Sequence, residues 1–179
     1  VTIITASYGF FGLCFLLGGL TLVLMVIAGF NRRPVASAVA RLDRLNLDAM
    51  VAGLGLLAIG TLLGGVWANE SWGRYWGWDP KETWALVSIL VYGLIVHFRW
   101  IPKLANPFTH ASWSFMAIWV IVMTYFGVNH LLVGLHSYAA GEAATVPTWV
   151  IFSFLGMAAF TLVGYFAWRD TELRRSLRP

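Results

Sequence analysis

A block of thirteen residues, 72–84, carries four tryptophans, one tyrosine and four charged side chains. Tryptophan has a wide apolar face, so a dense group of indoles suits a large, flat, apolar ligand. An aromatic belt at a membrane surface would account for one or two tryptophans at a helix end. It accounts poorly for a block that also contains Gly73, Gly77 and a charged stretch. We therefore predict a platform for a flat ligand, formed by Trp72, Trp76, Trp78 and Trp84.

Two of the four histidines are candidate ligands for a metal-containing ring. His97 lies in an apolar run, where an ionisable residue is by default a functional candidate. The alternative is a histidine that reaches the membrane surface beside Arg99. His136 lies in a polar loop, where a solvated side chain is the usual explanation. Because imidazole is a common axial ligand of haem iron, indole faces together with His136 form a plausible porphyrin site. We interpret His110 as a boundary residue.

The composition indicates an all-α, polytopic membrane helix bundle. The chain is 59% hydrophobic and 11% charged, whereas soluble domains carry about 25% charged residues. The apolar runs are continuous, which disfavours a membrane β-barrel. We expect a single membrane domain over 1–179, forming part of a longer protein. About five runs approach the length of roughly 20 residues that a spanning helix needs. These runs are 2–30, 47–68, 83–98, 111–128 and 148–168.

Basic residues orient this bundle. Ten of the twelve Lys and Arg residues fall on one side of the predicted spans, which the positive-inside rule assigns to the cytoplasm or its equivalent. Because this pattern accounts for the net charge of +4, the charge does not indicate binding to nucleic acid. The Trp-rich segment 69–84 and the loop 129–147 then face the outer side. The single cysteine, Cys14, excludes an internal disulfide and a CxxC site in this chain.

Local signals also mark where the third span begins. Asp79 is suited to the N-cap, and Pro80 is suited to the first helical position. Glu82 occupies the third helical position, where its side chain can complete a capping box with Asp79. Capping therefore offers an alternative to any catalytic use of the two carboxylates. No nucleotide-binding glycine motif, zinc-protease motif or Ser–His–acid set can be identified, and we assign no catalytic residue.

The block from Trp72 to Ala85 resembles the tryptophan-rich "WWD" signature of haem-handling proteins, and this resemblance makes Asp79, with the tryptophans, a candidate haem-binding residue. Its continuation is similar to the CcsA (ResC-type) subunit of the System II cytochrome c synthase. His97, the run 126–129 and the run 134–138 agree with that family, in the same order along the chain. The System I relatives CcmC and CcmF share the Trp-rich block, but their sequence after the aspartate differs.

This resemblance implies a path for haem b across the membrane. His97 matches a transmembrane histidine that pairs with a histidine of the partner subunit, CcsB (ResB). His136 matches one of two outer histidines that ligate haem beneath the WWD segment, and the other would precede Val1. Haem held there is attached to the CxxCH motif of apocytochrome c. Arg74 and Lys81 are the only cations in an outer loop, and we expect them to pair with haem propionates or, alternatively, with water and lipid headgroups.

The resemblance places the chain in a bacterial inner membrane or a thylakoid membrane, with the WWD segment on the periplasmic or lumenal side. Two other functions remain open from the sequence. A transporter subunit would use His97 for proton-coupled solute movement and would bind no haem. A structural anchor would need the Trp-rich block only for assembly. The platform of indoles argues against a proton relay, which has no need for one.

Overall fold

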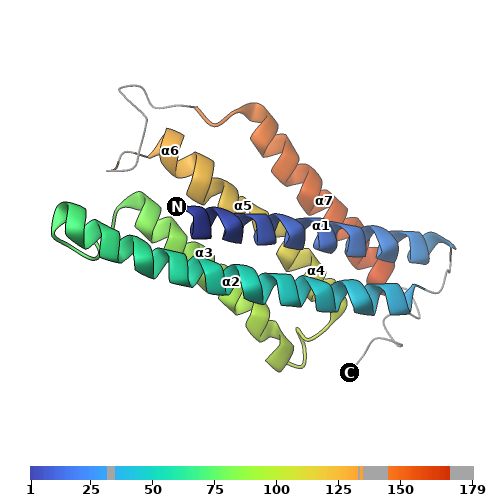
Figure 1. The fold of residues 1–179 in the computed structure, drawn as a ribbon. Coiled ribbons are helices and arrows are strands. Elements are labelled where there is room, and N and C mark those ends of the chain that lie inside the picture. Colours follow the sequence, from blue (N-terminus) through green and yellow to red (C-terminus); the bar gives the residue numbers. More distant parts are fainter. Residues whose placement is uncertain (32–34, 133, 135–144, 170–179) are drawn as a thin grey trace.

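The computed structural model describes residues 1–31, 35–132, 134 and 145–169 (Figure 1). Throughout these ranges the ordered elements are helical and no strand occurs, which confirms the predicted all-α class. The helices are α1 (Thr2–Asn31), α2 (Ala36–Trp72), α3 (Pro80–His97), α4 (Pro107–Met116), α5 (Ile118–Val122), α6 (Val128–Leu131) and α7 (Thr148–Arg169). A 3₁₀ turn, η1 (Phe98–Trp100), follows α3, and a π-helical turn, η2 (Met123–Gly127), joins α5 to α6.

Five helical stretches of the described chain are long and apolar enough to cross a membrane, as the hydropathy predicts. They are Thr2–Gly29, Ala36–Trp72, Pro80–Trp100, Pro107–Leu131 and Thr148–Arg169. The chain is therefore an integral membrane protein. The fourth stretch combines α4, α5, η2 and α6 into one nearly continuous rod.

The second span is longer than the apolar run 47–68 predicts. α2 has 37 residues, which corresponds to about 55 Å of helix, whereas the hydrocarbon core of a bilayer is about 30 Å thick. The helix includes residues 36–46, which lie outside the apolar run that predicts the second span. This stretch contains no glycine or proline, so nothing in it interrupts a helix that hydropathy alone would end at the membrane surface.

The core lies where α1, α2 and α3 meet. The rings of Phe11 and Tyr92 stack with centroids 3.8 Å apart, and both side chains are fully buried. Cys14, Met50 and Leu57 belong to the same cluster. Tyr92 therefore packs between helices. α7 packs against α1 and α4 but leaves most of its large apolar side chains exposed, as expected where lipid surrounds a helix.

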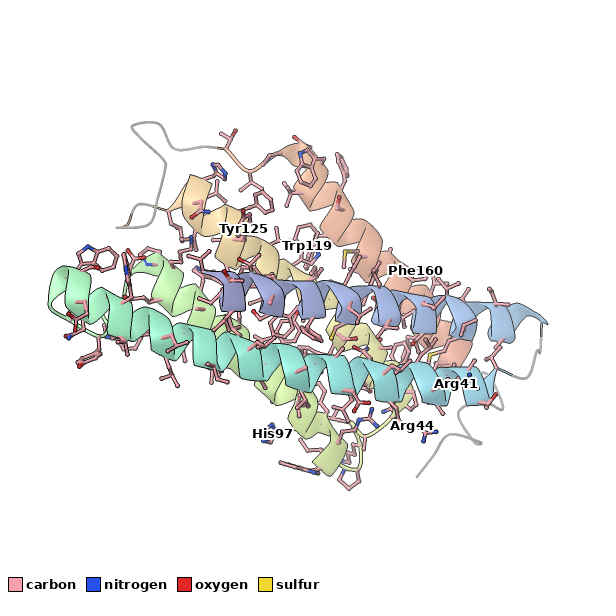
Figure 2. All side chains as sticks on the ribbon, in the orientation of Figure 1. Arg41, Arg44, His97, Trp119, Tyr125 and Phe160 are labelled. Carbon is pink, nitrogen blue, oxygen red and sulfur yellow. The ribbon has the colours of Figure 1, made fainter. Side chains whose placement is uncertain are left out.

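The two ends of the bundle differ in chemistry. Arg41 and Arg44 lie near the beginning of α2 (Figure 2), and Arg99 follows α3 at the same end. The chain between α2 and α3, with its tryptophans, lies at the opposite end (Figure 1). We call these the basic end and the Trp-rich end.

Candidate functional site

The Trp-rich segment is a tight reversal between α2 and α3. α2 ends at Trp72, and Gly73 follows in the left-handed region with φ of 70°, where its N–H donates to the carbonyl oxygen of Asn69 at 2.8 Å. Trp78 also has a positive φ, 55°, which is unusual for a bulky residue. A Cβ added to Gly65 would lie 3.0 Å from the carbonyl oxygen of Tyr75. The segment therefore folds back along the last turns of α2.

The predicted capping box at the start of α3 is confirmed. The backbone N–H of Lys81 donates to Oδ2 of Asp79 at 3.1 Å. Oε2 of Glu82 accepts from the backbone N–H of Asp79 at 3.2 Å and from that of Gly77 at 2.8 Å. Both carboxylates thus bind backbone groups, and Asp79 is only 6% exposed. These bonds fix the backbone that carries Trp76 and Trp78.

Replacing Asp79 with alanine is expected to destabilise this cap. Loss of an N-cap side chain typically costs about 1 kcal/mol of stability. Unfolding of the detergent-solubilised protein, followed by circular dichroism, should therefore begin at lower denaturant concentration. Asp79→Ser retains an acceptor oxygen and should recover most of the loss. Equal stability of Asp79→Ala and the wild type would show that the cap contributes nothing.

The aromatic side chains of the segment present open faces. Trp78 is 70% exposed, Tyr75 63% and Trp72 38%, while Trp76 and Trp84 are half-buried. Trp76 and Trp78 meet edge to face, with ring centroids 5.7 Å apart. Exposed indoles that rest against one another form a surface on which a flat apolar molecule can lie.

Trp67 belongs to the same aromatic group, although no sequence motif singles it out. Its ring meets that of Trp72 edge to face at 5.1 Å, and it is 58% exposed. Its place inside the apolar run assigned to the second span conceals this role. Its spacing of five residues from Trp72 is not one that places side chains on the same face of a helix, so no local pattern reveals it.

The two cations of the segment have different surroundings. The side chain of Arg74 folds over Gly77, since a Cβ added there would lie 2.5 Å from Cζ of Arg74. Nζ of Lys81 donates to Oδ1 of Asn129 at 3.1 Å. Lys81 thus joins the first turn of α3 to α6, across 48 positions of sequence.

A second contact places Gly134, which follows α6, beside the start of α3. A Cβ added to Gly134 would lie 2.6 Å from Oδ1 of Asp79 and 2.8 Å from Cδ of Pro80. The absence of a side chain at this position therefore permits the close approach. His136, two positions later, lies outside the described residues, as does most of the predicted loop 129–147.

A buried hydroxyl of the fourth span forms a hydrogen bond with α3. Thr124, in the π-helical turn η2, donates or accepts a hydrogen bond with Oγ of Ser88 at 2.9 Å and lies 2.7 Å from the carbonyl oxygen of Val120. A π turn contains one residue more than an α turn, so it changes the orientation of the later side chains about the helix axis. It therefore influences which side chains of α6 face α3.

His97 lies at the other end of α3. Its Nδ1 is 2.6 Å from the carbonyl oxygen of Gly93. A carbonyl only accepts, so Nδ1 carries the hydrogen, and in the neutral ring Nε2 keeps a free lone pair. The side chain is exposed, with the ring of Trp100 perpendicular to it at 4.7 Å. Figure 2 shows it directed away from the bundle.

The structure thus separates the predicted site residues into two groups. The Trp-rich segment and His97 lie at opposite ends of α3, which is 18 residues long and so spans about 26 Å. Among the described side chains, no group of three His, Cys, Asp or Glu residues could hold a metal ion. Within the described chain, neither end therefore offers a metal centre built from such a group.

His110 lies at the start of the fourth span, as the boundary interpretation predicts, but it also has a buried partner. The residue does lie in the first turn of α4, but its side chain is buried, 2% exposed, and its Nδ1 is 2.9 Å from Oδ1 of Asp43. His130, by contrast, is exposed at the end of α6.

Comparison with known proteins gives one family and a consistent set of relatives. The family model described as "Cytochrome C assembly protein" matches residues 1–136. Protein NrfI of Wolinella succinogenes is 48% identical over 142 residues, covering 79% of this chain and 16% of that protein. The proteins named "Cytochrome c biogenesis protein CcsA" of Coffea arabica and Hordeum vulgare are 45% and 46% identical over 104 and 102 residues. Those matches cover 57% and 56% of this chain but only 31% of each relative.

Proposed function

Because the chain belongs to the cytochrome c assembly protein family, we propose that it is the haem-handling part of a cytochrome c synthase. In this proposal it carries haem b across the membrane. It then presents the haem at the outer face for thioether attachment to apocytochrome c. The observation that carries the proposal is the group of exposed indoles at the Trp-rich end, where Gly134 also closely approaches Asp79 and Pro80.

At the Trp-rich end, the proposal gives each group one task. The indoles of Trp72, Trp76, Trp78 and Trp84 cover a porphyrin face and exclude water. Arg74 and Lys81 pair with the carboxylates of the ring. Asp79 acts through the cap, because its oxygens face backbone donors and Gly134. His136 follows Gly134 by two residues, a reach of at most about 7 Å, which supports its role as an outer axial ligand.

At the basic end, His97 is the proposed inner axial ligand. Its hydrogen bond to Gly93 leaves Nε2 available, and its exposure leaves room for a second ligand from outside this chain. Leu90 and Leu94 are 62% and 51% exposed, two turns and one turn earlier on α3. We propose that a CcsB (ResB)-type subunit, separate or fused, packs on this apolar face and contributes the opposing imidazole.

Haem supplies the iron that imidazoles ligate and the vinyl groups that acceptor thiols attack. The protein's contribution is to hold the ring, orient it and keep water from it. The basic end faces the cytoplasm or stroma in this proposal, because ten of twelve cations flank the spans on that side. The membrane is then a bacterial inner membrane or a thylakoid membrane.

An absorption spectrum of the purified complex with its partner subunit tests this function. We expect a Soret band and the reduced spectrum of iron ligated by two histidines. His136→Ala should remove or weaken the outer component while the component from His97 persists. A spectrum unchanged in His136→Ala would contradict the outer ligand. A colourless wild-type complex, prepared with ample haem, would contradict the function and favour the transporter alternative.

A further inference from the structure

A single buried carboxylate joins three elements at the basic end. Oδ2 of Asp43, on α2, accepts from Nη2 of Arg99 at 2.7 Å, and the same nitrogen donates to the backbone carbonyl of Asp43 at 3.3 Å. Oδ1 of Asp43 accepts from Nδ1 of His110, on α4, at 2.9 Å. The side chains of Asp43, Arg99 and His110 are 8%, 33% and 3% exposed. We call this group the Asp43 clasp.

Asp43 is the side chain on which the other two depend. Both hydrogen bonds found for Arg99 go to Asp43, and Nε of Arg99 and Nε2 of His110 are buried with no further partner among the described residues. A charge-assisted hydrogen bond between buried groups is strong, and removal of one partner leaves the other without compensation. Loss of the carboxylate should therefore weaken the attachment of η1 to α2 and α4.

The clasp acts on the backbone next to His97. His97 is the last residue of α3, and Arg99 follows it by two positions within η1. Between them, Phe98 is 4% exposed and its ring meets that of Trp113 edge to face at 5.4 Å. His97 itself is exposed and projects from the bundle. The direction of its imidazole therefore depends on the hydrogen bond to Gly93 and on how firmly the adjoining η1 is held.

We propose that Asp43 is a positioning residue for His97. Through Arg99 and His110 it holds η1 against the bundle, so that Nε2 of His97 projects at one fixed angle from the face of α3. This inference rests on the proposed function, in which His97 ligates haem iron. It adds a residue from a different helix, far from the ligand in sequence, whose loss should affect the inner haem alone.

The experiment compares three variants of the complex purified with its partner: Asp43→Asn, the conservative Asp43→Glu, and the control Asp48→Asn, whose side chain is less buried on the same helix. Haem content and the spin state of the iron are read from absorption spectra. In Asp43→Asn we expect a several-fold fall of the low-spin signal from the His97 site, with the outer signal unchanged. Asp43→Glu should recover part of it, and Asp48→Asn should match the wild type.

A second measurement does not depend on haem. His97→Cys, prepared haem-free with and without the additional Asp43→Asn substitution, is labelled with a maleimide, with Leu90→Cys as the reference position. Cys14 is fully buried and contributes little background. We expect Asp43→Asn to change the labelling rate at position 97 several-fold and to leave position 90 unchanged.

Unchanged spectra and unchanged labelling in Asp43→Asn would overturn the inference. Equal changes at positions 90 and 97, or equal loss of both haem signals, would also overturn it, because they would indicate general destabilisation. Absence of haem from the wild-type complex would instead contradict the proposed function. The labelling rates would then still decide whether Asp43 holds the backbone at residue 97.

Discussion

Replacing His97 with alanine is expected to eliminate the low-spin haem signal of the basic end and to lower cytochrome c formation by about 100-fold or more. Changes in groups that merely support a metal ligand cost about 10- to 100-fold, and here the ligand itself is removed. The side chain is exposed, so the variant should fold and reach the membrane at normal levels. Haem spectra of the purified complex and the yield of a reporter cytochrome c measure the two effects.

His130→Ala is the matched control, because it exchanges the same residue types at an exposed position on α6. It should leave the inner haem signal intact. Supplementing His97→Gly with free imidazole should restore part of that signal, since a small ligand can occupy the vacated position. If His97→Ala kept a wild-type spectrum and yield, the histidine would only mark the end of the span, and the inner ligand would have to be sought elsewhere.

Gly134→Val should selectively remove the outer haem. Any Cβ at this position would lie 2.6 Å from Oδ1 of Asp79 and 2.8 Å from Cδ of Pro80. Neither neighbour can move easily, because Asp79 caps α3 and Pro80 is in its first turn. The chain beyond α6 must therefore shift away from the Trp-rich end. We expect loss of most of the outer haem signal and a drop in cytochrome c formation, while the signal from His97 persists.

Gly156→Val provides the control for this substitution. Gly156 lies in α7, and a Cβ added there would meet no atom within 4 Å, so the same change of residue should be tolerated. Normal outer haem in Gly134→Val would mean that the approach to Asp79 has no part in haem binding. Loss of both haem signals would indicate misfolding rather than a local displacement.

Local features of the chain were predictable because local forces decide them. Five apolar runs, each long enough to need a lipid surrounding, predict five helices, and the described chain has five suitable stretches. The capping box at Asp79 and Glu82 was predictable because it involves residues within five positions of one another. The length of α2 was not predictable, because hydropathy indicates which residues lie in the lipid and does not show where the helix begins and ends.

The sequence by itself therefore determined the membrane class, the number of spans, the start of α3 and the residue types at each end. Only the tertiary structure decided which distant residues meet: Lys81 with Asn129, Gly134 with Asp79, and Asp43 with Arg99 and His110. These pairs lie 48 to 67 positions apart, beyond the reach of any helical or turn pattern. The polar pairs form because packed helices bring together side chains whose burial requires a partner, and a lone polar residue in a sequence does not reveal which helix will supply it. Gly134 meets Asp79 because a residue without a side chain permits close packing.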